Sequence, residues 1–269
     1  MSKKLNIDIE TLKHLYTDMD KTTYEMADIL HCDRGVITRR LKKHGIPIKR
    51  HKRVYSFYYE QTLNEMQKEL ILGSLIGDGH ICKHHEGPNS CRFMETHSIK
   101  QLEYMKWKKK ILENFVSNDI TIKRVDKSYS KGLFCVFQTV LHKDLKIFRD
   151  MFYDNNGIKH IPYFRLSPLS LAVWYFDDGS IAKINQKGSF YSIQMHTQSY
   201  DHESILNLKR MLEDFGINSG TTRSQGYELI NIGHRGAKKI IEIANKYVVP
   251  CMSYKIKFSD NPVETCSSS

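Results

Sequence analysis

Two stretches of the chain end an apolar run with an aspartate and a glycine, residue types that can do chemistry at such a junction. They read ILGSLIGDGHI from residue 71 and LAVWYFDDGSI from residue 171, which places Asp78 and Asp178 100 residues apart (178 − 78). The last carbonyl groups of a helix carry partial negative charge, so an acid there is disfavoured unless a cation or hydrogen-bond donor offsets it. Each aspartate therefore needs such a partner.

A purely structural explanation of these residues also exists. Asp-Gly is a common turn dipeptide, and Gly179 suits the left-handed conformation that closes many helices. One occurrence alone favours this turn interpretation. Two occurrences at the ends of similar apolar runs favour a shared function.

The stretches around the two aspartates predict similar orders of elements. In the first copy we expect a helix from the capping signal Thr62-x-x-Glu65 to Gly77, strands over 90–96, 121–124 and 133–141, and a helix over 101–115. In the second, Ser167-Pro168 starts a helix, followed by strands over 189–198 and 227–233 and helices over 202–216 and 236–247. Three landmarks keep the 100-residue offset: Leu112 with Leu212, Glu113 with Glu213, and Phe115 with Phe215. The pattern predicts two copies of one α+β unit side by side.

The first 53 residues have a different pattern, with helical stretches over 9–16, 23–30 and 33–44. Thr22 or Thr23 can cap the second helix and Asp33 the third, and the arrangement resembles a helix-turn-helix. Its third helix can enter a major groove with an outward face of Arg34, Thr38, Arg39, Lys42 and Lys43. The stretch KKHGIPIKRHKR, residues 42–53, has no acid and suits a linker that follows phosphates. The alternative is a three-helix appendage with a solvated basic face.

The composition favours a polyanionic partner. The 269 residues hold 41 Lys and Arg against 30 Asp and Glu, a net charge of +11, and 40% hydrophobic residues can bury a full core. No apolar run approaches the roughly 18 to 20 residues of a membrane span. The start, MSKKLNIDIE, lacks a signal-peptide core and carries acids that a transit peptide avoids. We therefore expect an intracellular, cytoplasmic protein that binds nucleic acid and no membrane.

Six cysteines occur without a CxxC pair, which argues against a disulfide framework. The stretch CKHHEGPNSC, from Cys82 to Cys91, offers four soft ligands that can in principle hold zinc. Its spacing fits no standard zinc site. The alternative is a polar loop between two strands.

The two helix ends Gly77-Asp78-Gly79 and Asp177-Asp178-Gly179 resemble the paired motifs of the single-chain LAGLIDADG homing endonucleases. The resemblance covers roughly residues 56–258. It implies a first repeat over 56–165, a second over 166–258 and a tail over 259–269, after the helix-turn-helix-like module and linker of 1–53. Ile76 and Phe176 stand where the first motif aspartate belongs, and Val173 where a glycine belongs. These departures concern helix packing more than chemistry.

The resemblance implies that the two motif helices pack together along a pseudo-twofold axis and that Asp78 and Asp178 bind divalent metal. Mg²⁺, with Mn²⁺ as a substitute, prefers oxygen ligands and keeps several waters. We expect the backbone carbonyls of Gly77 and Asp177 to add ligands. The Asp177 carboxylate itself is not expected to be catalytic, because its counterpart is Gly77.

Phosphodiester hydrolysis also needs positive charge near the attacking water and the leaving oxygen. Lys159, in KHIP, and Lys255, in VVPCMSYK, each lie beside a Pro-containing, strand-like turn and resemble the active-site lysines of the single-chain members. The histidines are expected to contact DNA or to be ordinary polar residues. The alternative for each lysine is a solvated surface charge.

The resemblance further implies two antiparallel sheets that form a saddle on double-stranded DNA, with alternate side chains facing the major groove. The candidate DNA-contacting residues of the sheets are Lys83, Arg92, Lys123, Arg124, Lys183, Gln194, His196, Arg223 and Gln225. We expect a monomeric, magnesium-dependent endonuclease that cuts both strands of a long asymmetric target, in an intron or intein setting. The alternatives are a transcription regulator that has lost cleavage, against which Asp78 and Asp178 argue, and an RNA-binding intron maturase.

Overall fold

The structure is a computed structural model that describes residues 8–48, 61–83, 91–127, 130–184, 191–224 and 226–256. The chain divides into two compact units, residues 1–55 and 56–269. Each unit has its own apolar core. Within the described ranges, every helix is too short or too polar to span a bilayer.

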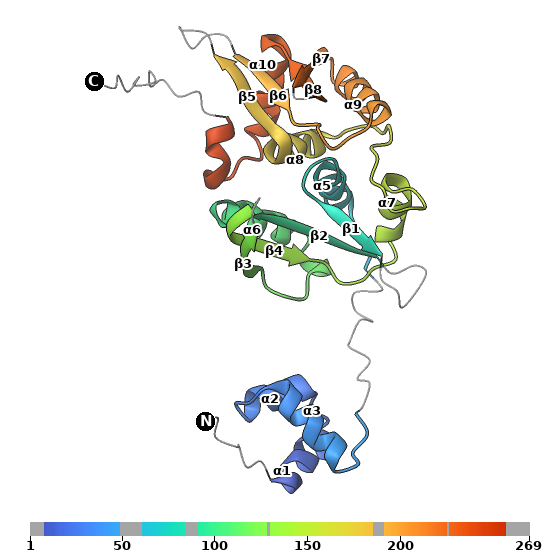
Figure 1. Ribbon diagram of the computed structural model, residues 1–269, viewed down its shortest axis with the longest axis vertical. Helices are drawn as coiled ribbons and strands as arrows, with labels where there is room; N and C mark the ends of the chain where they lie inside the picture. The colour runs from blue at the N-terminus through green and yellow to red at the C-terminus, as the bar shows by residue number, and fades with distance from the viewer. Residues whose placement is uncertain are drawn as a thin grey trace, which may run out of the picture. The chain divides into compact units, whose positions relative to one another are not determined.

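The regular elements in the described part of the smaller unit, residues 8–48, are all helices. Its elements are α1 (Ile9–Lys13), the π-helical turn η1 (His14–Asp18), α2 (Thr23–Ile29) and α3 (Arg34–Lys43) (Figure 1). Thr22 and Glu25 form a capping box at the start of α2, and Asp33 caps α3, because a side-chain oxygen satisfies a free backbone N–H there. The core includes Tyr16, Met26, Ile37 and Leu41.

The first half of the larger unit is a helix followed by an antiparallel sheet and its covering helices. Its elements are α5 (Glu65–Ile76), β1 (His80–Lys83), β2 (Cys91–Ser98), η2 (Ile99–Gln101), α6 (Leu102–Ile111), η3 (Glu113–Phe115), β3 (Thr121–Lys127), β4 (Ser130–Gln138) and α7 (Leu145–Phe152). The strand order is β1-β2-β4-β3.

The second half repeats this plan. Its elements are α8 (Pro168–Asp178), β5 (Gly179–Ile184), β6 (Tyr191–Met195), α9 (His202–Asp214), β7 (Ser219–Ser224), β8 (Tyr227–Ile232), α10 (His234–Ala244) and η4 (Pro250–Lys255), with strand order β5-β6-β8-β7. His80 pairs with Met94 in the first sheet and Ser180 with Gln194 in the second, so the 100-residue offset holds in three dimensions. The predicted α+β class, with two antiparallel sheets, is confirmed.

Four elements and two local details differ from the sequence prediction. Strands β1, β5 and β7 and helix α7 were not predicted. The first long helix is capped by Asn64, in a capping box with Gln67, and not by Thr62 with Glu65. The alternative turn interpretation of Gly179 does not hold, because the Gly179 backbone is extended and not left-handed, with φ −82° and ψ 148°. A Cβ there would lie 2.1 Å from the Tyr175 ring, so close packing explains this glycine.

Helices α5 and α8 lie side by side between the two sheets (Figure 1). Most of α8 is buried, and Ser167 caps its start with Pro168 in the first turn, as predicted. A Cβ on Gly73 would lie 2.6 Å from the carbonyl oxygen of Ser170, so a side chain at this position would force the helices apart. The close approach brings the ends of both helices to the same place.

We predict that Gly73→Ala lowers the free energy of unfolding of the larger unit by about 1–3 kcal/mol, because the added methyl group overpacks the α5–α8 contact. Both tryptophans, Trp107 and Trp174, belong to this unit, so thermal unfolding followed by tryptophan fluorescence reports on it. Gly220→Ala is the matched control, since nothing lies within 4 Å of a Cβ there. Equal stability of the two variants would contradict the prediction.

Candidate active site

Two aspartates lie at the adjoining ends of α5 and α8. Asp78 follows Gly77, the C-cap of α5, and Asp178 is the last residue of α8. The side chain of Asp78 is 47% exposed, whereas Asp178 is only partly accessible. Burial, together with the carboxylates of Asp177 and Asp78, raises the pKa of Asp178 to about 8. The charges of Asp177 and Asp78 therefore oppose the ionisation of Asp178.

One lysine lies beside each aspartate. Lys159 Nζ donates to the carbonyl oxygens on either side of Asp78, and Lys255 Nζ does the same around Asp178. The distances are 3.3 Å to Gly77 and 3.1 Å to Gly79 for Lys159, and 3.3 Å to Asp177 and 2.8 Å to Gly179 for Lys255. Lys159 and Lys255 therefore supply the positive charge that the sequence analysis expected beside each acidic helix end.

The two lysines are held by different local structures. Lys159 forms an isolated antiparallel bridge with Tyr153, in line with the strand-like turn predicted for it. The same prediction is wrong for Lys255, which lies in the 3-10 helix η4, where its carbonyl accepts a hydrogen bond of 2.5 Å from the Tyr175 hydroxyl. Burial lowers the pKa of Lys159 to about 8 and lowers that of Lys255, although neighbouring aspartates oppose the change.

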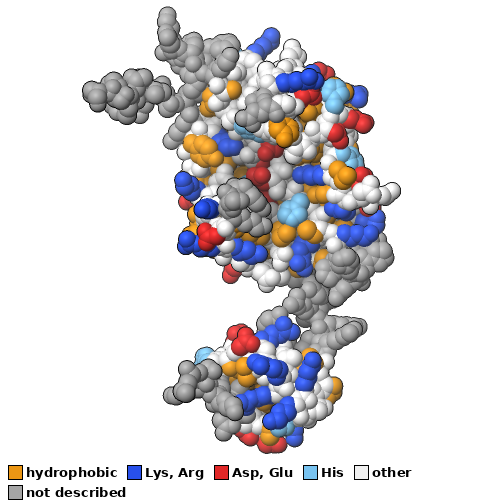
Figure 2. Space-filling model, viewed as in Figure 1, with side chains coloured by type: hydrophobic (Ala, Val, Ile, Leu, Met, Phe, Trp, Pro, Cys, Tyr) orange, Lys and Arg blue, Asp and Glu red, His pale blue; other side chains and the backbone are white. Residues whose placement is uncertain are grey.

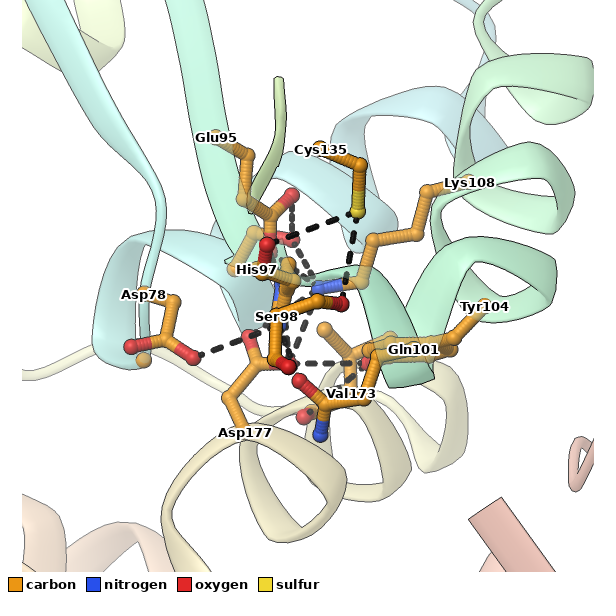
Figure 3. A network of polar contacts seen from close by, with 12 residues as sticks. Asp78, Glu95, His97, Ser98, Gln101, Tyr104, Lys108, Cys135, Val173 and Asp177 are labelled. Carbon is orange, nitrogen blue, oxygen red and sulfur yellow. Dashed lines mark hydrogen bonds and ion pairs between the residues drawn. The ribbon is translucent and has the colours of Figure 1, made fainter. Parts of the chain in front are cut away.

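The side chain of Asp177 is fully buried in a polar network (Figure 3). Its two carboxylate oxygens accept hydrogen bonds of 3.0 and 3.1 Å from Lys108 Nζ, and one also accepts 2.9 Å from the Tyr104 hydroxyl. Lys108 donates in addition to Glu95 and, at 3.1 Å, to Ser74 Oγ. A Cβ on Gly77 would lie 2.5 Å from the Asp177 Cβ, which explains why the two motifs differ here.

His97 joins this network to Asp78. Its Nε2 lies 2.9 Å from Glu95 Oε1, and its Nδ1 lies 3.0 Å from Gln101 Oε1 and 3.6 Å from Asp78 Oδ2. Burial opposes the charged imidazole, but the hydrogen bond and the charge of Glu95 outweigh it and raise the pKa of His97. A protonated imidazole donates from both nitrogens, which matches acceptors on its two sides.

Sequence reasoning missed Glu95 and Lys108 and assigned His97 no structural role. A signal was present in the repeat itself. At the 100-residue offset, Glu95 corresponds to Met195 and Lys108 to Leu208, so polar residues replace apolar core residues in one copy only.

The oxygen atoms at the ends of α5 and α8 are suitable ligands for a hard divalent cation. Asp78, His97 and Asp177 each offer a ligand atom within 4.8 Å of the others. However, Lys108 and Tyr104 already bind the Asp177 carboxylate, and both ring nitrogens of His97 already face side-chain oxygens, of Gln101 and of Glu95. The donors left are the carboxylates of Asp78 and Asp178 and neighbouring backbone carbonyls, all of them oxygens, as Mg²⁺ and Mn²⁺ prefer.

The candidate DNA-contacting residues of the sheets divide between two faces. Cys91, Phe93, Glu95 and His97 point into the core, so Arg92 points outward. The strand registers put Lys123, Gln194 and His196 on this outward side, and Arg124 and Arg223 on the side covered by helices. A one-residue step reverses the direction of a strand side chain, so Arg124 and Arg223 start from the side opposite to Arg92. Their side chains are 77% and 80% exposed, and contact of either with DNA stays a prediction.

The remaining candidates are placed as follows. Lys83 is exposed at the end of β1. Arg39, Lys42 and Lys43 are exposed on α3, while Arg34 Nε donates 3.1 Å to Thr23 Oγ1 and Thr38 is partly buried. The side chain of Lys183, residue Gln225 and most of the stretch between Cys82 and Cys91 lie outside the described residues. Figure 2 shows acidic side chains near the middle of the larger unit, with Lys and Arg on the surrounding surface.

A solved structure and several curated proteins are similar to this chain. The structure titled "The homing endonuclease I-WcaI bound to its DNA recognition sequence" matches 81% of this chain and 98% of its own, with a TM-score of 0.70 and 23% identity. The DNA endonuclease I-ChuI of Chlamydomonas applanata is 28% identical over 217 residues, which cover 72% of this chain and 96% of its own.

Protein RecA of Mycolicibacterium flavescens is 28% identical over 206 residues, which cover 72% of this chain and 47% of the RecA chain. The match therefore spans about half the length of that relative. The model of the LAGLIDADG DNA endonuclease family matches residues 68–240, well over half of the chain. The match includes both helix ends, and the chain therefore belongs to the LAGLIDADG DNA endonuclease family.

Proposed function

We propose that the chain is a monomeric, site-specific endonuclease that hydrolyses one phosphodiester bond in each strand of a long, asymmetric double-stranded DNA target. One observation carries the proposal. Two aspartates stand at adjoining helix ends in pseudo-symmetric positions, each with a lysine bound to the carbonyls beside it. Two copies of one site in a single chain suit a substrate with two antiparallel strands.

In this proposal Asp78 and Asp178 hold Mg²⁺, assisted by the carbonyl oxygens of Gly77 and Asp177. When bound, the divalent ion supplies charge that activates water and stabilises the leaving oxygen. The raised pKa of Asp178 supports this assignment, because clustered acids that disfavour a further negative charge are stabilised by a cation.

Lys159 and Lys255 stabilise the negative charge that develops on each phosphate. Their ammonium groups already lie against the helix ends, so little reorganisation is needed when DNA binds. The Asp177 carboxylate takes no direct part, since Lys108 and Tyr104 hold it in the core.

The sheets bind the target in this proposal. Arg92 Nη1 donates 3.1 Å to Gln138, and Gln194 Nε2 donates 3.2 Å to Asn231, so each sheet has a cross-strand polar pair on its outward side. Polar side chains in such rows can read base edges, while lysines and arginines contact phosphates. The smaller unit adds a second contact through the exposed basic residues of α3.

We predict that Asp78→Asn or Asp178→Asn lowers the cleavage rate by about 100-fold or more, because an amide is a poor ligand for a hard cation. Duplexes that the parent chain binds are first selected from a randomised DNA library in the presence of Ca²⁺. Cleavage of the selected duplex in Mg²⁺ is then followed on both strands, and affinity is expected to stay within a few-fold of the parent.

The matched control is Asp119→Asn, since Asp119 is an exposed acid paired with Lys109 away from the helix ends. Normal cutting by either active-site variant would overturn the metal assignment. A parent chain that binds the selected duplex but never cuts it would instead identify a DNA-binding regulator. Selection of RNA in preference to duplex DNA would point to a maturase.

We predict that Lys159→Met and Lys255→Met each slow cleavage by about 100-fold at saturating protein, because each removes one stabilising charge from the site. Affinity should change far less. The control is Lys110→Met, which removes an exposed lysine of α6. If the site variants lost affinity and cut normally once saturated, the two lysines would be phosphate anchors.

We predict that a chain starting at residue 56 still cuts, because both aspartates and both lysines belong to the larger unit. Its binding should be less salt-dependent, since each lost phosphate contact removes about 0.9 from the slope of log K against log salt. The protected DNA should also shorten at one end only. An unchanged slope and footprint would show that the smaller unit does not contact DNA.

A further inference from the structure

The polar network beside the active site occurs in one repeat only. Five buried members belong to the first repeat, namely Ser74, Glu95, His97, Tyr104 and Lys108, and two of these, Tyr104 and Lys108, bind the Asp177 carboxylate of the second repeat. The residues at the same offset in the second repeat include an indole, a thioether and an aliphatic side chain. The pairs are Ser74 with Trp174, Glu95 with Met195, His97 with Thr197, and Lys108 with Leu208. The two halves thus support their aspartates differently.

On the first side, the network ends at Asp78. The His97 ring is buried, with 2% of its side chain exposed. Its Nδ1 lies 3.0 Å from Gln101 Oε1, its hydrogen-bond partner, and makes a longer ion-pair contact of 3.6 Å with Asp78 Oδ2 (Figure 3). Glu95 holds the opposite nitrogen at 2.9 Å, and Lys108 in turn binds Glu95. A ring fixed on one edge by a buried acid presents its other N–H in a defined direction.

On the second side, no equivalent donor reaches Asp178. Thr197 occupies the position that corresponds to His97, and its hydroxyl donates 2.7 Å to the carbonyl oxygen of Glu228. Within the described residues, neither aspartate carboxylate has a side-chain hydrogen bond, but Asp78 has the 3.6 Å ion-pair contact with His97 and Asp178 has no such contact. The backbone carbonyl of Asp178 accepts a hydrogen bond of 3.0 Å from the N–H of His196. The difference between the two aspartates is therefore a difference in what orients the carboxylate.

We propose that His97 is a positioning residue for Asp78, held by Glu95 and Lys108, and that it makes the two cleavage sites of this chain non-equivalent. This inference rests on the proposed endonuclease function. One strand depends on an imidazole that orients its carboxylate, and the other strand does not. Loss of the contact between His97 and Asp78 converts a double-strand cutter into an enzyme that nicks one strand.

Two substitutions of His97 distinguish the contacts made by its Nδ1 from the contact made by its Nε2. His97→Asn keeps an N–H donor near the position of Nδ1, which faces Gln101 and Asp78, whereas His97→Gln keeps one near Nε2, which faces Glu95. The matched control in the second repeat is Thr197→Val. Each variant is incubated with a supercoiled plasmid that carries a duplex cut by the parent chain, and with the same duplex labelled on either strand. Affinity in Ca²⁺ and the thermal unfolding midpoint are measured alongside.

For His97→Gln we expect one strand to be cut about 10- to 100-fold more slowly, the range typical of lost orienting contacts at metal sites. The other strand should change less than about 2-fold, so nicked plasmid accumulates. His97→Asn and Thr197→Val should cut both strands at similar rates. A purely structural role for His97 would slow both strands together and would not distinguish the Asn variant from the Gln variant.

Equal slowing of both strands in His97→Gln, or no slowing, overturns the inference and leaves the proposed function intact. A parent chain that cuts no selected duplex rejects the proposed function itself. If His97→Gln does not fold, Glu95→Gln serves in its place, because it leaves the imidazole but removes the charge that orients it. The same one-strand loss is then expected, and equal loss on both strands again overturns the inference.

Discussion

The close contact between α5 and α8 is the constraint on which the site depends. The helices approach closely because Gly73 and Gly77 have no Cβ where the backbone of Ser170 and the side chain of Asp177 lie. This contact brings two helix C-termini, each with partial negative charge, to one place. Without the lysines that bind their carbonyls, that arrangement would be electrostatically unfavourable. The same two lysines therefore stabilise the helix packing and supply positive charge to the candidate active site.

The two repeats have kept the same backbone plan while their interiors have diverged. Strand order and register agree between the sheets, and the aspartates and lysines occupy related positions. The core behind them is apolar in the second repeat and contains an ion-paired network in the first. A buried ion pair adds little net stability compared with an apolar replacement, so its value lies in fixing particular geometries.

Much of the site could be predicted from the sequence because it is repeated. Asp78 and Asp178 end similar apolar runs at a fixed offset, and the family resemblance added Lys159 and Lys255. The buried network could not be predicted in this way. Lys108 lies in the run KWKKK, which has the composition of a solvated face, and its burial depends on Asp177, 69 residues away. The short strand β1 has too few residues to display alternation. Two of the three sheet arginines expected to face the groove lie on the opposite side of the sheet, by one position of register.

The bonds between the lysines and the helix-end carbonyls also determine how an ion can enter. The oxygen of Gly77 accepts from Lys159, and that of Asp177 accepts from Lys255. In the proposed function, a cation bound to these oxygens would lie beside an ammonium group, and the repulsion between the two positive charges would favour movement of the lysine away from the carbonyl. A phosphate offers each displaced ammonium group a new partner. If the chain acts as proposed, substrate and metal would therefore favour each other's binding through the same two side chains.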